Sequence, residues 1–462
     1  MPDSVQRMAC DSTHIRPPYP GYFDHVGAQL EKDRQRARPP ESEFDGARAE
    51  LRAELATIVE ELAPQLIALA KDLHDHPETA FDEHRSVAAL VSLLNEHGID
   101  AKADVFGVET AAVADLPGDA PDASSRRVAI LSEYDALPGI GHACGHNVIA
   151  ASGVGAFLAL AQLRQRHPEA IPGRVRWLGT PAEEGHTGKE YMARGGAFEG
   201  LDAAIMIHPY GYDVTDQVWL GRRTLNVTFH GQPAHASAQP FMGVNALDAA
   251  SIAYQGIGLL RQQMLPVDRV HTMMSEGGDR ASIIVERAQL KMYVRSKYPD
   301  TLRDLSQRVE NVCRGAALMT GCRVDIDWDE HPPSLPVRSN KELEARFAAA
   351  MVDRGRRILP GGVLPETIAA STDFGNVSYR VPGIHPLVKI SDESVALHTA
   401  EFAQAAASPA AETAISDASF ALAATALDFL SDDELAQAVA EEFEAAGGAV
   451  DVPSYFDAKD PS

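Results

Sequence analysis

The chain has 462 residues, of which 45% are hydrophobic and 23% charged, as is usual for a globular protein with a large core. Its 41 basic and 66 acidic residues give a net charge of −25, which argues against a nucleic-acid partner because nucleic acids bind basic surfaces. No long apolar run or apolar leader is present, so we expect neither a membrane-spanning helix nor a secretory signal. The few scattered cysteines (Cys10, Cys144, Cys313 and Cys322) favour a reducing cytoplasm over a disulfide framework.

The N-terminal part of the chain is predicted to contain a polar arm followed by two helices. Residues 1–45 are polar and rich in proline, and we expect an arm that is partly disordered or packs onto the rest of the chain. Residues 46–76 carry apolar side chains at helical spacing. Residues 85–97 predict a second helix, which stops at Gly98.

Short apolar runs follow, and side chains capable of chemistry come after each of them. The runs are 127–132, leading into EYDALPGIGHACGHN; 174–179, leading into TPAEEGHTG; 203–207, leading into His208; and 386–391, a few residues before His398. Such runs, alternating with helices such as 148–163, predict an α/β fold with a mixed, mostly parallel sheet flanked by helices. Because sites in these sheets lie beyond the carboxyl ends of the strands, we expect a single active site.

Residues 218–335 have a different pattern and predict an inserted domain. Alternating residues at 224–231 predict a strand, and the segments after it predict a helix at 245–264, strand–turn–strand at 282–296, a helix at 299–319 and a strand at 324–328. This order is typical of a ferredoxin-like α+β domain. We therefore expect an arm (1–45), a main domain (46–217 and 336–462, ending in alanine-rich helices at 403–430 and 433–446) and an inserted domain (218–335).

The residues after the apolar runs include a set of candidate metal ligands. Cys144 and His146 lie two positions apart in a glycine-rich loop, and the adjacent Glu183 and Glu184 could act as base and ligand. With His208 and His398 they offer thiolate, imidazole and carboxylate groups, which suit zinc, manganese, cobalt or nickel better than magnesium or calcium. Each residue alone could be structural, but their convergence at strand ends favours a pair of divalent ions that activates water and polarises a carbonyl.

The segment EYDALPGIGHACGHN resembles the signature of the M20 metallopeptidase family, in its amidohydrolase branch (subfamily D). Segments 73–84, 179–185, 230–250, 371–386 and 397–402 resemble other motifs of that branch, and the match covers about residues 47–432. STDFGNVS and HTAEF look closest to the subgroup that contains the p-aminobenzoyl-glutamate hydrolase B subunit and the animal M20 domain-containing protein 2. The resemblance implies a zinc-exopeptidase-like catalytic domain, an inserted lid and dimerisation domain, and a homodimer.

The resemblance also implies a role for each candidate residue. Cys144 would be shared by two divalent ions, with zinc or manganese expected first and cobalt or nickel as alternatives; the other ligands would be His146, Glu184, His208 and His398. Glu183 would be the general base and acid, and Asp135 would orient the ligands. His235 would stabilise the oxyanion, often in the neighbouring subunit, and Arg295 would bind a substrate carboxylate. Alternatively, His235 could satisfy backbone groups in its loop, and Arg295 could be a surface residue.

Two positions depart from the family pattern. Asn147 stands where the family has an acid, which could weaken a contact to a metal ligand. Ser282, in the stretch 282–285, stands where the family has an asparagine, so substrate specificity cannot simply be transferred from relatives.

The predicted function is a metal-dependent amidohydrolase or peptidase. We expect it to cleave the amide bond of an N-acyl or aminobenzoyl-type amino acid by metal-activated water, with a dipeptide as the second substrate class. A cysteine amidase, with Cys144 as nucleophile and His142 or His146 as base, is one alternative. A non-catalytic partner subunit of a hetero-oligomeric hydrolase, or a metal-dependent binding protein, is another. The expected partner is a small molecule, with no nucleic acid and no membrane.

Overall fold

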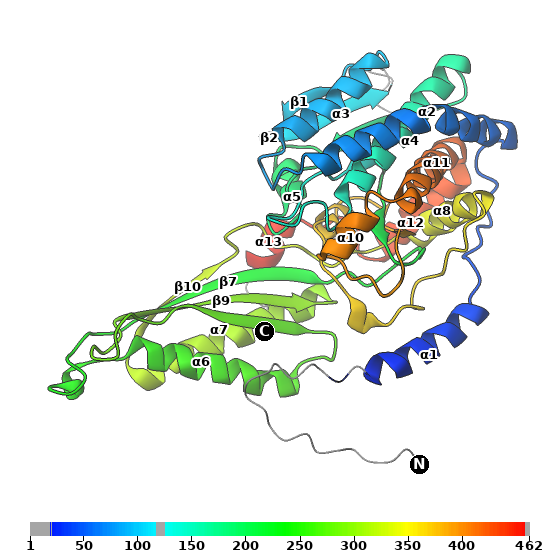
Figure 1. Ribbon diagram of the computed structural model, residues 1–462. Helices are drawn as coiled ribbons and strands as arrows, with labels where there is room; N and C mark the ends of the chain where they lie inside the picture. Colours follow the sequence, from blue (N-terminus) through cyan, green and yellow to red (C-terminus); the bar gives the residue numbers. More distant parts are fainter. Residues whose placement is uncertain (1–18, 20, 117–124, 458–462) are drawn as a thin grey trace.

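The computed structural model describes residues 19, 21–116 and 125–457, which form two bodies, each built on its own sheet (Figure 1). The first body contains a six-stranded sheet with the order β1-β2-β4-β3-β5-β11. Strands β4, β3, β5 and β11 run parallel, and β1 and β2 form an antiparallel edge, so the predicted mixed, mostly parallel sheet is confirmed. The strands are β1 Lys102–Val105, β2 Val108–Leu116, β3 Arg127–Ser132, β4 Arg174–Gly179, β5 Ala203–Ile205 and β11 Gly383–Ile384.

A two-stranded ladder extends the sheet at the edge where the site lies. Strand β6 (His208–Tyr210) pairs in parallel with β12 (Leu387–Lys389). The run predicted at 386–391 therefore belongs to this ladder, and β11 takes the place beside β5 in the main sheet. The pairing is interrupted because Pro386 has no backbone N–H to donate to a ladder. His208 still contacts the connection between β11 and β12, because its N–H donates to the carbonyl of Pro386 at 2.8 Å.

Long helices cover the main sheet and supply most of the core. Helix α4 (His146–Arg166) packs against α2 (Ala49–Asp75) and α11 (Pro409–Ser431). Helices α4 and α11 are long and apolar enough to cross a membrane, but 94% of each apolar window is buried inside the protein, so core packing accounts for their composition. Gly155 permits the close approach, because an added Cβ would lie 2.3 Å from Ser419 Oγ. The other helices of this body are α3 His84–Glu96, α5 Gly188–Arg194, α8 Lys341–Asp353, α9 Phe374–Ser378, α10 Ala400–Ala405 and α12 Asp433–Ala445.

The helix predicted at 403–430 is divided into α10 and α11. Pro409 begins α11, and the Ser408 hydroxyl caps it by accepting from the N–H of Ala411. A proline suits the first helical turn but cannot continue a helix that comes before it. The prediction of one continuous helix is therefore wrong at residues 406–408.

The second body contains an antiparallel sheet with the order β10-β7-β9-β8 and two helices on one face (Figure 1). Its elements are β7 Gly221–His230, α6 Ala246–Leu260, β8 Arg269–Glu276, β9 Arg287–Ser296, α7 Pro299–Thr320 and β10 Arg323–Trp328. The strand–helix–strand–strand–helix–strand order is the one expected, and buried side chains between sheet and helices form a separate core. The first of the two strands predicted within 282–296 is wrong, because the strand that precedes β9 is β8, at Arg269–Glu276. Only Val270 of β8 is fully buried, so this edge strand shows little of the alternation that identifies a strand in sequence.

Both ends of the described chain pack onto these bodies. Helix α1 (Gly21–Arg36) buries Leu30 against Tyr212, Val214 and Trp219, so this part of the expected arm is a docked helix. Helix α13 (Val452–Asp457) places Phe456 against the core of the second body. The C-terminal segment, expected to belong wholly to the main domain, thus reaches the inserted one.

Candidate active site

Four segments of the chain bring the candidate ligands together. Cys144 and His146 lie at the start of α4, the Glu183–Glu184 pair follows β4, His208 begins β6, and His398 precedes α10. Their ligand atoms form three groups whose members all lie within 4.8 Å of one another: Cys144, His146 and His208; Cys144, Glu184 and His398; and His146, Glu183 and Glu184. Every predicted ligand is therefore a member of one connected cluster.

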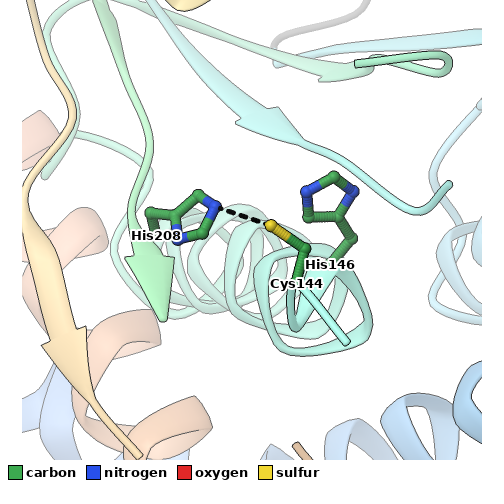
Figure 2. Close-up of side chains that lie close together, drawn as sticks. All are labelled: Cys144, His146 and His208. Carbon is green, nitrogen blue, oxygen red and sulfur yellow. Dashed lines mark hydrogen bonds between the residues drawn. The ribbon is translucent and has the colours of Figure 1, made fainter. Parts of the chain in front are cut away.

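The turn in GHACGHN sets the geometry of the first group (Figure 2). Cys144 Sγ lies 3.5 Å from His208 Nε2, and the His146 ring stands edge-on to the His208 ring with centroids 6.0 Å apart. Gly145, between Cys144 and His146 in the sequence, has a φ of +78°, and an added Cβ would lie 2.7 Å from the Pro209 ring. Only glycine adopts this conformation at low cost in so little space. The turn therefore holds the Cys144 thiol against the start of β6.

The second group centres on the Glu184 carboxylate. Its Oε1 lies 3.3 Å from His398 Nε2 and 4.0 Å from His146 Nε2. The backbone near this group is strained, because Ala182, Thr187 and His398 all have φ near +60° although none is glycine. Such strain is concentrated at functional sites, where surrounding packing holds it.

Asp135 connects two of the ligands. Its Oδ1 accepts from His146 Nδ1 at 3.0 Å, and its Oδ2 accepts from the Glu184 N–H at 2.8 Å. Burial alone would raise the pKa of Asp135, but the charge of His146 and these hydrogen bonds lower it. With Nδ1 engaged, His146 Nε2 faces the cluster and is free to bind a metal.

The donor atoms of the cluster fit a metal. His146 Nε2 and Glu184 Oε1 are buried and have no hydrogen-bond partner among the described residues, although they face each other. Buried polar atoms are nearly always paired, so two such atoms beside a thiol leave a gap that a cation would fill. Sulfur, imidazole and carboxylate donors suit zinc and the neighbouring transition metals.

The two adjacent glutamates have opposite electrostatic environments. Burial and the charges of Glu133, Glu184 and Asp373 raise the pKa of Glu183 well above its usual value. Burial also acts to raise the pKa of Glu184, but the imidazole of His398, 3.3 Å away, and the charge of His146 lower it. A carboxyl with a raised pKa can carry a proton, whereas an ionised carboxylate is suited to bind a cation.

A buried ion network that the sequence patterns did not predict lies beneath the cluster. Lys189 Nζ contacts Glu133 Oε1 at 2.5 Å and Asp373 Oδ1 at 2.6 Å, and all three side chains are buried. Glu133 Oε2 lies 3.5 Å from His146 Nε2. Glu133 could have been found, because it precedes Asp135 by two residues in an extended segment and faces the same side. The Lys189 pairing joins residues 56 and 184 positions apart and has no local signal.

A cavity of about 600 Å³ joins the cluster to the second body. Cys144, Glu183, Glu184, His208 and His398 line it, together with Trp219, Tyr293, His271 and three arginines, Arg222, Arg269 and Arg295. Arg295 therefore reaches the same cavity as the candidate ligands, as a substrate-binding residue must.

His235 and Ser282 lie elsewhere in the second body. Arg222, at the start of β7, lines the cavity, whereas His235 lies beyond the other end of this strand of about 30 Å. The His235 side chain is exposed, and its Nδ1 accepts from the N–H groups of Ser237 and Ala238. Ser282 is nearby, since its carbonyl accepts from the N–H of Ala236. Within one chain, neither joins the cluster.

The Asn147 side chain makes structural hydrogen bonds at the position where the family's acid was expected to contact a metal ligand. Its buried Nδ2 donates to the carbonyls of Ala70 at 3.2 Å and Ala406 at 2.9 Å. These bonds tie α2 and the turn before α11 to the start of α4. The departure from the family pattern therefore affects helix packing.

Comparison with known proteins identifies the family. The sequence profile of Peptidase family M20/M25/M40 matches residues 129–446, more than half of the chain. The chain belongs to this family. The Xaa-Arg dipeptidase of Mus musculus is 38% identical to this M20 protein over 398 residues, which cover 85% of this chain and 92% of the relative. The B subunit of the p-aminobenzoyl-glutamate hydrolase of Escherichia coli (strain K12) is 26% identical over 443 residues, covering 81% and 91%.

Solved structures agree on the fold. A dinuclear metal-binding peptidase of the M20 family from Bacillus subtilis superposes with a TM-score of 0.61 at 21% identity, covering 80% of this chain and 99% of the other. The predicted family, fold class and enzyme class are confirmed. This M20 protein is a metal-dependent hydrolase of amide or peptide bonds.

Proposed function

We propose that this M20 hydrolase cleaves the amide bond between an acyl or aminobenzoyl group and an amino acid. The observation that carries the proposal is the single cavity that holds the ligand cluster, Glu183 and Arg295 together. Arg295 binds the carboxylate of the amino acid, and the scissile carbonyl lies toward the cluster. The similarity to one subunit of an aminobenzoyl-glutamate hydrolase supports this substrate class.

The site would hold two divalent ions, with zinc or manganese first and cobalt or nickel as alternatives. Cys144 would be shared between them, and the remaining ligands would be His146, Glu184, His208 and His398. The unpaired buried atoms of the cluster and the dinuclear Bacillus relative support this set. When bound, such ions polarise a carbonyl and lower the pKa of water.

Glu183 carries the proton during the reaction. It accepts a proton from the attacking water and returns it to the nitrogen of the leaving amine. Its position supports this role, because Glu183 lines the cavity beside the ligand cluster, where both transfers take place. Asp135 acts indirectly by holding His146 in one tautomer.

A dipeptidase with the same chemistry is the second candidate, favoured by the 38% identity to an Xaa-Arg dipeptidase. A dipeptide has a free α-amino group, which requires an acidic neighbour. Glu183 and Glu184 are the carboxylates that line the cavity among the described residues. A free amino group would therefore compete with the proposed metals and base for these carboxylates, which favours an acylated substrate.

The cysteine-nucleophile alternative receives no support from the thiol's surroundings. Burial and the charge of Glu184 raise the pKa of Cys144 well above its usual value, whereas an activated thiol requires a lowered pKa. His142, one of its two candidate bases, is buried with its ring stacked on His74 at 6.5 Å. The presence of Glu183 also argues against a non-catalytic subunit.

The remaining parts of the proposal concern assembly and location. A homodimer would allow the exposed His235 of one subunit to complete the site of the other. The free thiols of Cys144, Cys313 and Cys322 favour the reducing cytoplasm. Fractionation of cells that express a tagged chain tests the location.

Elemental analysis of the purified protein, combined with an amine-release assay, tests the proposed reaction. The substrate panel contains N-acetyl amino acids, p-aminobenzoyl-glutamate and dipeptides, each assayed with and without chelator. We expect two transition-metal ions per chain, and release from acylated substrates that chelator abolishes and metal restores. Turnover confined to dipeptides would reject the substrate class. Turnover that survives chelation but not thiol alkylation would favour the cysteine mechanism.

A further inference from the structure

Three arginines form a row across the sheet of the second body. Arg222 of β7 lies directly opposite Arg295 of β9, which lies directly opposite Arg269 of β8. All three line the cavity that contains the ligand cluster. Like charges directly opposite one another on neighbouring strands destabilise a sheet, so the row carries a cost that folding alone does not explain.

None of the three arginines forms an ion pair within 4.0 Å among the described residues, although Asp329 and Asp268 act on Arg222 and Arg269 from further away. Arg222 donates to the Thr187 hydroxyl at 2.7 Å and Arg295 Nε to the Ser371 hydroxyl at 3.2 Å, while Arg269 donates to backbone carbonyls. By contrast, Arg223, the neighbour of Arg222 in sequence, pairs with the carboxylate of Asp329. Burial and the charge of Arg222 lower the pKa of Arg295, as expected of a guanidinium whose near neighbour is another cation.

The cavity therefore has two ends of opposite character. Glu183 and Glu184 are its lining carboxylates, and both belong to the metal cluster. The far end presents the arginine row together with His271 and the ring of Tyr293, which lies 4.7 Å from the Arg295 guanidinium. One substrate carboxylate can form a bidentate pair with one arginine. The other cations of the row then remain unpaired in a partly buried cavity.

We propose that Arg222 and Arg269 bind a second acidic group, so that the substrate is an N-acyl amino acid with an acidic side chain, of the aspartate or glutamate type. This proposal rests on the proposed function, because it places the substrate's α-carboxylate on Arg295. It also separates this chain from its dipeptidase relatives, since a C-terminal arginine would bring a fourth cation to the row. Arg222 and Arg269 are thus specificity-determining residues.

Steady-state kinetics on three substrates tests the proposal: N-acetyl-L-glutamate, N-acetyl-L-alanine and L-alanyl-L-arginine. We expect the glutamate substrate to have the highest kcat/KM. Arg269→Gln and Arg222→Gln should each lower kcat/KM for it by about 10–100-fold, the usual effect of losing a charge-assisted hydrogen bond. Arg269→Gln should change kcat/KM for the alanine substrate less than about 3-fold. Arg269→Gln is the cleaner variant, because Arg222 also contacts Thr187 beside the catalytic turn.

Arg314→Gln is the matched control. Arg314 lies on α7 of the same body, is exposed and pairs with Glu310, so its loss removes one positive charge without touching the cavity. We expect it to leave the glutamate preference unchanged. Equal kcat/KM for the glutamate and alanine substrates in the unmodified protein would overturn the proposal. Fastest turnover of alanyl-arginine, or an equal loss of preference in the control, would do the same.

A binding measurement distinguishes failure of this proposal from failure of the proposed function. Calorimetry compares free L-glutamate with L-alanine, using the unmodified protein and Arg269→Gln. Tighter binding of glutamate that the variant loses supports the row as a dicarboxylate site, even if no amide is hydrolysed. Hydrolysis of N-acetyl-alanine without tighter glutamate binding rejects the row while leaving the hydrolase function intact.

Discussion

Asp135 holds the ring of His146 through a hydrogen bond of 3.0 Å between Oδ1 and Nδ1, and both side chains are buried. The bond directs His146 Nε2, which has no hydrogen-bond partner among the described residues, toward the Glu184 carboxylate. The second oxygen of Asp135 accepts from the Glu184 N–H, so one side chain sets the position of two proposed ligands.

Replacing this carboxylate should weaken metal binding. In Asp135→Asn an amide oxygen can still accept from His146, but the amide nitrogen then faces the N–H of Glu184, and the charge is lost. We expect metal affinity or kcat to fall by about 10–100-fold, measured by competition with a chromogenic chelator. Asp115→Asn, at the remote ion pair with Arg176, is the control and should bind metal normally.

Substitutions of the two adjacent glutamates should have different effects on turnover and on metal content. Glu183→Gln should retain metal but lose about 10²–10⁴-fold in kcat, because it removes the group that carries the proton. Glu184→Gln should instead lower the metal content. Both are measured by elemental analysis and steady-state kinetics on the same preparations. Near-normal turnover by Glu183→Gln would end its assignment as the base.

Removing the buried lysine should destabilise the protein strongly. In Lys189→Met the carboxylates of Glu133 and Asp373 lose their shared cation, and breaking a buried ion pair typically costs about 3–5 kcal/mol. Urea denaturation measures the change in the free energy of unfolding. Lys71→Met removes an exposed pair with Glu412 and should cost at most about 1 kcal/mol. Equal losses in the free energy of unfolding for the two variants would show that the buried network stabilises the protein no more than an exposed ion pair does.

The stability of the protein should depend on Glu83 near neutral pH. Burial and the charge of Asp135 raise the pKa of this buried carboxyl from 4.5 to about 7. Between these values the unfolded chain loses the proton while the folded chain keeps it, so stability falls as pH rises through this range. Glu83→Gln removes this loss and keeps the oxygen that accepts from the Ala182 N–H.

Denaturation of both proteins at several pH values tests this prediction. The free energy of unfolding of Glu83→Gln relative to the unmodified protein should rise by about 3 kcal/mol between pH 4.5 and pH 7, at about 1.4 kcal/mol per pKa unit. Above pH 7 the difference should level off. A difference that stays constant with pH would contradict the raised pKa.

Subunit mixing tests whether His235 acts on the neighbouring site. His235 is exposed beyond the far end of β7, outside the cavity of its own chain. Mixing inactive His235→Ala and Glu183→Ala subunits should restore part of the activity, because half of the sites in a mixed dimer then contain both groups. Complete lack of rescue in proven mixed dimers would place both groups within one chain.

The family, the α/β sheet and the ligand cluster can be inferred from the amino-acid sequence, because they depend on local patterns. Apolar runs identify β3, β4 and β5, and the letters that follow them name Cys144, His146, Glu183, Glu184 and His208. Parallel strands bring their carboxyl ends to one edge, so residues at those ends are predicted to meet.

The tertiary structure decides what depends on pairing between distant segments. Strand β8 was missed because an edge strand buries little and shows a weak alternation. The pairing of Lys189 with Asp373 and the row of Arg222, Arg295 and Arg269 arise only when strands and loops far apart in the chain become neighbours. A register shift of one residue would turn these arginines to the opposite face of the sheet, so only the folded pairing reveals a cationic end to the substrate cavity.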